Sequence, residues 1–202
     1  MKDEAVKISK REQKAIKSKK ALLDAAAQLF REKSINSVGV REISAAAGVT
    51  TGTFYHYFKS KDEILDKIYE KRDKDYEELI EKLKNESSSY TEAIRSFFVD
   101  FLSKMVETDG IDFTTHRMFV LRRKAEKESY MVTGIMKLVD LAKENGELDK
   151  KYDSFEISHF LFVVFRGVVY DWCLTHEKIG EGSLAEREDK AIRAAIRAYL
   201  AC

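Results

Sequence analysis

The sequence of 202 residues contains no proline and only nine glycines. Because proline removes a backbone N–H and interrupts helices, its absence leaves few forced breaks and favours helices over a strand-rich fold. The two cysteines, Cys173 and Cys202, offer neither a disulfide framework nor a metal-ligand spacing. Such sparse cysteine is typical of a reducing compartment, so we expect a cytoplasmic protein without a metal site or a cofactor.

Long apolar runs are also missing. The first residues, MKDEAVKISKREQK, lack the apolar segment of a secretory signal peptide. The longest apolar stretch, residues 160–169, contains Arg166 and falls well short of the ~20 residues that a membrane-spanning helix needs. We therefore expect a buried helix at this position and no membrane association.

Charge is unevenly distributed although the net charge is only +1. Residues 1–61 carry 13 Lys and Arg against 6 Asp and Glu, whereas residues 62–202 carry 23 against 29. A basic first part on an acidic remainder indicates a polyanionic partner for the first part alone. The competing interpretation is a solvated lysine-rich arm, and composition favours neither.

Apolar residues recur at helical spacing along nearly the whole chain. No segment alternates with the period of a strand, and we find no internal repeat. The sequence therefore predicts an all-α fold with an N-terminal domain, residues 1–61, and a larger second domain, residues 62–202. The expected helices cover residues 10–33, 40–47, a short segment after residue 50, then 61–85, 91–108, 113–127, 130–145, 154–175 and 184–200.

Gly48 separates two of the short helices in the manner of a helix-turn-helix. The first helix offers Ile43 and the small Ala47 to its partner, and the second offers Val49 and Phe54. Small side chains let the helices cross closely, and the first helix then holds the second in position to enter a DNA major groove. The alternative is an ordinary helical corner whose aromatic residues lie in the core.

The outward side of the second short helix has the chemistry for contacting DNA. Hydroxyl, methyl and imidazole groups suit base edges, tyrosine and lysine suit phosphates, and arginine can contact guanine through two hydrogen bonds. Lys61 is the foremost phosphate candidate, because it starts a helix behind the Ser60–Glu63 capping box. The expected DNA-contacting residues are Arg41, Thr50, Thr51, Gly52, Thr53, Tyr55, His56, Tyr57 and Lys61.

The basic residues of the expected first helix leave two possibilities open. They could follow the DNA backbone or enter a minor groove. They could equally form a solvated helix start. The residues concerned are Lys7, Lys10, Arg11, Lys14, Lys17, Lys19 and Lys20.

The segment AAAGVTTGTFYHYFKSKDEIL, residues 45–65, resembles the signature of the TetR family of bacterial transcription regulators. The upstream segment, residues 21–48, resembles the family's first two helices, and beyond about residue 66 only the number and length of helices match. The resemblance implies an N-terminal three-helix head on a larger helical domain that binds an effector and dimerises. It also implies a repressor that leaves a palindromic operator in double-stranded DNA when a small molecule binds.

Four positions depart from the family pattern. Ser34 stands where the family usually has glycine, Val38 and Gly39 replace a pair of hydroxyl residues, and Tyr57 replaces a frequent histidine. Gly39 can still begin a helix, since glycine is only slightly worse than serine as an N-cap. The replacement does remove a hydroxyl that could contact a phosphate at this helix start.

The family resemblance implies a homodimer in which the last two long helices of each chain form a four-helix bundle. The segment 154–175 is apolar almost all round, which burial on several sides explains, and Gly167 would allow a partner helix to approach closely. The alternative is a core helix buried within one chain. The expected interface residues are Phe160, Val164, Gly167, Val168, Ile192, Ile196 and Tyr199.

The helices between about residues 62 and 150 would then enclose an effector pocket suited to a hydrophobic or aromatic molecule, although such aromatic spacing is more often a packed core. A guanidinium within an apolar helix needs a partner. For Arg166 we expect an acid such as Asp140 or Asp171, in the same chain or across the dimer, or an anionic group of the ligand; otherwise the side chain reaches the surface. The expected ligand-binding residues are Phe97, Phe101, Met105, His116, Phe119 and Arg166.

Enzymatic motifs are missing. His176-Glu177 is not followed by a second histidine at zinc-protease spacing, and residues 180–183 lack the Lys-Ser/Thr pair of a phosphate loop. We therefore expect no enzyme. Two alternatives to a ligand-released repressor stay open: a helical ligand-binding or interaction module without DNA binding, and a ligand-independent activator or architectural DNA-binding protein.

Overall fold

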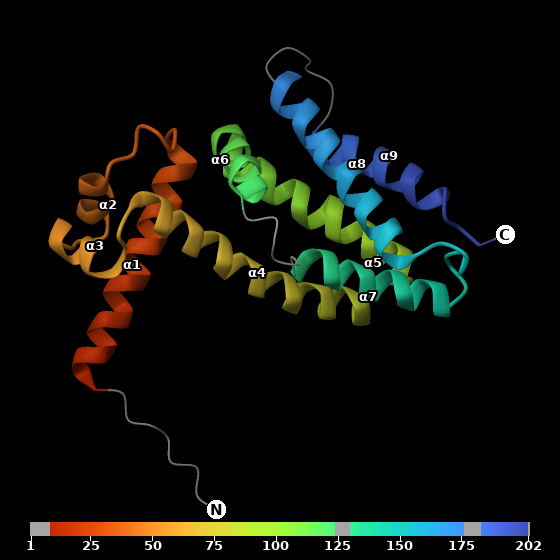
Figure 1. The fold of residues 1–202 in the computed structure, drawn as a ribbon, viewed down its shortest axis with the longest axis horizontal. Helices are drawn as coiled ribbons and strands as arrows, with labels where there is room; N and C mark the ends of the chain where they lie inside the picture. The colour runs from red at the N-terminus through yellow and green to blue at the C-terminus, as the bar shows by residue number, and fades with distance from the viewer. Residues whose placement is uncertain (1–8, 124–129, 176–182, 202) are drawn as a thin grey trace, which may run out of the picture. The chain divides into compact units, whose positions relative to one another are not determined.

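A computed structural model of the chain describes residues 9–123, 130–175 and 183–201, with all of their side chains except those of residues 71–74, 117–123 and 130. Within this part the chain is helical, and the only β-type pairing is an isolated bridge between Leu148 and Leu200 (Figure 1). The all-α prediction is therefore confirmed. The chain divides into two compact units, Met1–Glu70 and Lys71–Cys202, which we call the head and the body.

Helix α1 (Lys10–Glu32) is the longest helix of the head. It starts with a capping box, in which Ser9 Oγ accepts from the Glu12 N–H at 3.2 Å and the Glu12 carboxylate accepts from the Ser9 N–H at 2.8 Å. Leu22, Ala26 and Phe30 recur every four residues and are buried on one face. The head continues with two short helices, α2 (Val40–Ala46) and α3 (Thr51–Tyr57).

Helix α4 (Lys61–Glu86) begins behind the expected cap. Ser60 Oγ accepts from the Glu63 N–H at 3.2 Å, as predicted. The Glu63 carboxylate accepts from the Lys59 N–H at 2.6 Å, one residue before the donor that a capping box uses. The first turns of α4 belong to the head, so the division of the structure lies beyond the boundary expected at residue 61.

The body begins with a change of helix type that apolar spacing does not predict. In place of one helix over residues 91–108, the structure has α5 (Tyr90–Ser96), a π-helical segment η1 (Phe97–Ser103) and the start of α6 (Lys104–Arg123). Ser103 Oγ donates to the Phe98 carbonyl five residues earlier, at 3.1 Å, within the wider π turn. The expected break at Gly110 is a kink inside α6, where φ is +76°, a value that glycine adopts without strain.

Helices α7 (Tyr130–Glu144), α8 (Ser154–Thr175) and α9 (Leu184–Arg197) complete the body, close to the predicted ranges. Its main core draws side chains from α4, α5, η1, α7, α8 and α9. A Cβ at Gly134 of α7 would lie 2.1 Å from Ile80 Cδ1 of α4, so the end of the Ile80 side chain fills the space beside this glycine. The core is thus densely filled at this crossing.

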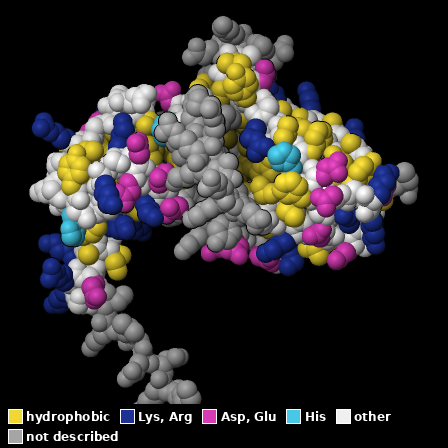
Figure 2. All heavy atoms as spheres, viewed as in Figure 1, with side chains coloured by type: hydrophobic (Ala, Val, Ile, Leu, Met, Phe, Trp, Pro, Cys, Tyr) yellow, Lys and Arg dark blue, Asp and Glu magenta, His cyan; other side chains and the backbone are white. Residues whose placement is uncertain are grey.

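Helix α8 has two kinds of surface. By length and composition it could cross a membrane, with a mean hydropathy of 1.4, yet Leu161, Phe162 and Val169 are buried in the body. It is therefore a core helix of the body, with one apolar face uncovered in the single chain, and Figure 2 shows apolar side chains gathered in this region. The exposed large apolar residues of α8 are Phe155, Phe160, Val163, Tyr170 and Leu174.

Candidate nucleic-acid interface

The turn between α2 and α3 is built on Gly48. Its φ of +66° lies in the left-handed region, which side chains other than glycine rarely adopt. The Val49 N–H donates to the Ser44 carbonyl at 3.0 Å and closes the end of α2. Ser44 is itself buried and donates to the Val40 carbonyl at 2.8 Å. These bonds fix the direction in which α3 leaves α2.

Helix α3 is anchored through its aromatic inner face. Phe54 and Phe58 are at most 1% exposed, and their ring centroids lie 5.7 Å apart. On the other side of the helix Tyr55 is 57% exposed and His56 is also exposed. The expected inward position of Phe54 is confirmed, Phe58 is buried beside it, and the polar rings are left free to meet a ligand.

The start of α3 is held by two threonines. Thr50 is the N-cap: its Oγ1 accepts from the Thr53 N–H at 3.1 Å and lies 2.9 Å from Thr53 Oγ1. Thr50 and Gly52 are exposed, whereas Thr51 and Thr53 are half-buried. Thr50 therefore has a structural role in addition to the DNA contact expected from the sequence.

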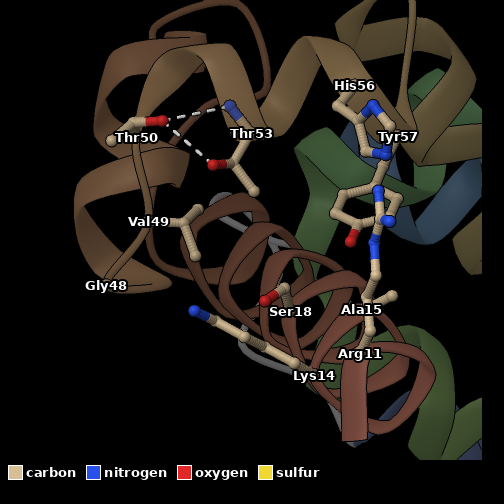
Figure 3. A pocket seen from close by; sticks show the side chains of 10 residues that line it. All are labelled: Arg11, Lys14, Ala15, Ser18, Gly48, Val49, Thr50, Thr53, His56 and Tyr57. Carbon is tan, nitrogen blue, oxygen red and sulfur yellow. Dashed lines mark hydrogen bonds between the residues drawn. The ribbon is translucent and has the colours of Figure 1, made fainter. Parts of the chain in front are cut away.

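A cleft of about 510 Å³ opens on the head between the first turns of α1 and helix α3 (Figure 3). Figure 3 shows the Arg11 side chain reaching toward Tyr57 and the Lys14 side chain pointing toward the Gly48 side. No carboxylate lines the cleft. The lining residues are Arg11, Lys14, Ala15 and Ser18 from α1, with Gly48, Val49, Thr50, Thr53, His56 and Tyr57 from the turn and α3.

Lys61 does not lie as the sequence suggests. Its Nζ donates to the backbone carbonyls of Ile35 and Val38, at 2.6 and 3.2 Å, and the residue is only partly exposed. The ammonium group thus fastens the start of α4 to the connection between α1 and α2. The expected phosphate contact of Lys61 stays a prediction, and it would use the third N–H of the ammonium group.

Other basic residues of the head are exposed. Arg41 lies in the first turn of α2, and Lys59 lies between α3 and α4. The N-cap of α2 is Gly39, which makes no side-chain hydrogen bond, as expected from the glycine at this position. Figure 2 shows basic side chains gathered along the lower part of the head, over the first turns of α1.

The residues expected to bind an effector divide into core and half-exposed positions. Phe97 is fully buried and belongs to the main core of the body. Phe101 and Met105 are only partly buried, and a tyrosine hydroxyl from α4 donates to Met105 Sδ at 3.3 Å. Phe97 is therefore a packing residue in this structure. His116 is half-buried, and the Phe119 side chain lies outside the described residues.

Arg166 is exposed, and the intrachain ion pair expected for it is absent from the described residues. Both acids proposed as its partner are engaged elsewhere. Asp140 accepts from the Ser154 hydroxyl, and Asp171 lies 3.5 Å from Arg187. Within one chain, therefore, the guanidinium lies on the uncovered face of α8 and not inside the body.

The residues expected at a dimer interface are only partly on the surface. Ile192 and Ile196 are 0% and 8% exposed and belong to the core of the single chain, so they offer little surface to a partner chain. Their face of α9 packs inward because it is the apolar side of an amphipathic helix. Phe160 is 40% exposed and Gly167 is exposed. Val164, Val168 and Tyr199 are half-buried.

Sequence reasoning missed two features. The exposed stripe of α8 includes Val163, Tyr170 and Leu174, which could not be separated from the buried ones because the helix is apolar all round. Glu188 of α9 is 0% exposed, and neither carboxylate oxygen has a hydrogen-bond partner among the described residues. Burial raises its pKa to about 9. Its spacing of four from Leu184 was the available signal, since it places an acid on the apolar face.

Two short helices joined by a glycine turn, with a polar outer face and a helical body, define the helix-turn-helix class of proteins. Residues 22–68 match the family model of bacterial regulatory proteins of the tetR family. The chain is thus similar to members of this family over residues 22–68.

Individual relatives agree with this assignment. The HTH-type transcriptional repressor KstR2 of Rhodococcus jostii (strain RHA1) is 47% identical over 47 residues, which span 23% of each chain. The match thus spans about a quarter of that protein. The HTH-type transcriptional repressor BepR of Brucella suis biovar 1 (strain 1330) is 25% identical over 170 residues, 78% of this chain and 81% of BepR.

The fold is also shared with solved structures. Thermus thermophilus FadR, described as a TetR family transcriptional repressor in complex with lauroyl-CoA, superposes with a TM-score of 0.68 at 20% identity. The superposition covers 91% of this chain and 96% of FadR. At this identity the likeness shows a common fold.

Proposed function

We propose that the chain is a sequence-specific DNA-binding transcription regulator, and that it is a repressor released from its operator by a small molecule. The observation that carries the proposal is the construction of α3, whose inner face is locked by Phe54 and Phe58 while Tyr55 and His56 project outward. A rigid helix with a polar free face is what reading a major groove requires. The names of KstR2 and BepR support the repressor assignment.

We assign base contacts and phosphate contacts to different sides of this surface. Hydroxyls and imidazole recognise base edges, whereas tyrosine hydroxyls and ammonium groups recognise phosphates. The base-contacting set is Arg41, Thr51, Gly52, Thr53 and His56. The phosphate-contacting set is Thr50, Tyr55, Tyr57 and the remaining N–H of Lys61.

We further propose a homodimer that places two heads on the half-sites of a palindromic operator. A short recognition helix reads only a few base pairs, and a twofold symmetric dimer doubles the site. The uncovered apolar stripe of α8 supports this, because contiguous exposed apolar surface marks an interaction site. Tyr170 and Leu174 are each 60% exposed, and Gly167 between the apolar residues leaves open space for a partner helix.

The effector that fits this body is an apolar small molecule. Phe101 and Met105 are the expected residues of η1 and α6 that keep part of their surface beside the core. The lauroyl-CoA named for Thermus thermophilus FadR is an example of a ligand with a long apolar part. Binding would act through α4, whose residues belong to both units, by biasing one of two helix positions. Such a regulator would work in the cytoplasm.

An electrophoretic mobility shift with the full chain tests the proposal. The probe is the duplex upstream of the protein's own gene, titrated over a range of salt concentrations. We expect a specific complex whose affinity falls with salt. Candidate acyl-CoA and aromatic ligands should then release the duplex. The absence of any complex at low salt rules out DNA binding and favours an interaction module; a complex that no ligand dissociates favours a ligand-independent regulator.

A further inference from the structure

We propose that the cleft between α1 and α3 holds the sugar–phosphate backbone of one DNA strand, with Arg11 and Lys14 contacting its phosphates. This rests on the proposed DNA-binding function. It adds the first turns of α1 to the interface, and it assigns their charge to backbone contacts and not to a minor groove.

The charge of the cleft fits an anion. Arg11 and Lys14 are exposed, and neither has an ion-pair partner among the described residues. The nearest acid in sequence, Glu12, is occupied at the helix start, where its carboxylate accepts from the Ser9 N–H at 2.8 Å. Two cations that share a cleft without a carboxylate repel each other, so a bound phosphate would relieve this repulsion.

The shape of the cleft fits a passing strand. Arg11, Ala15 and Ser18 follow one another at helical spacing, so α1 turns one continuous side toward α3. The small Ala15 and Ser18 leave room between the basic residues and the opposite wall. At about 510 Å³ the cleft far exceeds the roughly 30 Å³ that one water molecule occupies in the liquid. It is therefore not a crevice for a single solvent molecule.

The opposite wall of the cleft belongs to the recognition surface. Thr53, His56 and Tyr57 of α3 line it, and the Tyr57 ring packs edge-on against His56 with centroids 4.8 Å apart. A helix that enters the major groove has a phosphate backbone along its flank, and the preceding helices contact that backbone. A strand in the cleft would therefore be held from α1 while α3 contacts base edges.

The test compares three variants of the full chain: Arg11→Ala, Lys14→Ala and Lys20→Ala. Lys20 is the matched control, because it is exposed on the same helix and lies nine residues from Arg11, about half a turn away in rotation. Affinity is measured by fluorescence anisotropy with a duplex selected from a random-sequence library, across a salt series. Circular dichroism melting checks that each variant is folded.

For Arg11→Ala and Lys14→Ala we expect affinity to fall roughly tenfold, and the salt slope to fall by about one in each case. The loss should be the same for matched and mismatched duplexes, because phosphates carry no sequence. Ethylation interference gives a local readout: the phosphates that block wild-type binding when ethylated should lose this effect in the Arg11→Ala variant.

Three results would overturn the proposal. If Arg11→Ala and Lys14→Ala behave like Lys20→Ala while the wild type binds the duplex, the cleft is not a DNA site and the proposed function stands. If the wild type binds no duplex, both proposals fail. Calorimetry could show that inorganic pyrophosphate binds the wild type and not the Arg11→Ala variant. If duplex affinity is the same in both proteins, the occupant of the cleft is a free phosphorylated molecule.

Discussion

The Lys61 ammonium nitrogen lies 2.6 Å from the backbone carbonyl oxygen of Ile35, a residue 26 positions earlier in the chain. It also donates to the Val38 carbonyl at 3.2 Å. Ile35 and Val38 themselves have buried side chains, so the connection between α1 and α2 is fixed on both sides. Through one side chain, the start of α4 determines where this connection and the following α2 lie.

Replacing Lys61 with methionine should therefore destabilise the head as well as weaken DNA binding. Two carbonyls would lose a charged donor, which costs about 1–3 kcal/mol. Hydrogen exchange of amides in residues 33–39 and in the first turn of α4 would measure this loss. Lys59→Met is the control, because Lys59 is exposed and, within the described part of the chain, its side chain makes no hydrogen bond to that connection. Equal exchange in both variants would contradict the bridging role.

The cap of α3 makes a second prediction. Thr50→Ala removes the oxygen that accepts from the Thr53 N–H and should cost about 1 kcal/mol of helix stability, whereas Thr50→Ser keeps the oxygen and should cost much less. Chemical denaturation followed by head-specific amide signals measures the difference. If serine and alanine weaken DNA binding equally while stability is unchanged, the role of Thr50 lies in the contact with DNA and not in the cap.

Local features of this fold are predictable from the sequence because local interactions determine them. Apolar spacing gives the positions of α1, α8 and α9, and Gly48 gives the turn. The inward direction of Phe54 and Phe58 follows from the helical period once the turn is placed. Each of these depends on residues within a few positions of one another.

Long-range features escape such reasoning. The Lys61–Ile35 bond joins segments 26 residues apart, so the capping box beside Lys61 does not predict it. The apolar residues of the π-helical segment η1 show the same kind of pattern as those of an α-helix, so the sequence does not reveal the change of helix type. In α8 the apolar residues surround the helix, and only packing shows that Leu161 is buried and Tyr170 exposed.

The uncovered stripe of α8 can be tested against the core face of α9. Tyr170→Glu places a charge on a residue that is 60% exposed, so the chain should stay folded but lose its dimeric state. Ile192→Glu buries a charge in the core and should unfold the body. Light scattering after size exclusion measures the mass, with Lys137→Glu on the exposed side of α7 as the control. A monomeric wild type, or a dimeric folded Tyr170→Glu variant, would remove α8 from the interface.

Residues assigned to bases and to phosphates should differ in how their loss changes binding. His56→Ala and Thr53→Ala should change the preferred base at one position of each half-site, by about 1–3 kcal/mol per base pair. Tyr57→Phe removes only a hydroxyl and should weaken all duplexes alike. Binding-site selection from a random library, performed with each variant, distinguishes the two patterns. An unchanged selected sequence in both His56→Ala and Thr53→Ala would refute the base-contact assignment.

Glu188 should make the free energy of unfolding decrease as the pH rises. Its pKa is raised by burial to about 9, so between about pH 4.5 and 9 the folded chain holds a proton that the unfolded chain has released. The free energy of unfolding should then decrease with rising pH over this window, by at most about 1.4 kcal/mol per pH unit from this group. Glu188→Met removes the titrating carboxyl and should flatten the decrease.

The same substitution should also raise the stability of the body at neutral and higher pH. Both carboxyl oxygens of Glu188 are buried without a hydrogen-bond partner among the described residues, and methionine buries no such oxygen. Urea denaturation of the wild type, of Glu188→Met and of Glu77→Met over a pH series measures this, since Glu77 is an exposed glutamate of α4. If Glu188→Met and Glu77→Met follow the same pH profile as the wild type, the carboxyl of Glu188 titrates as an ordinary surface group and is not held protonated within the body.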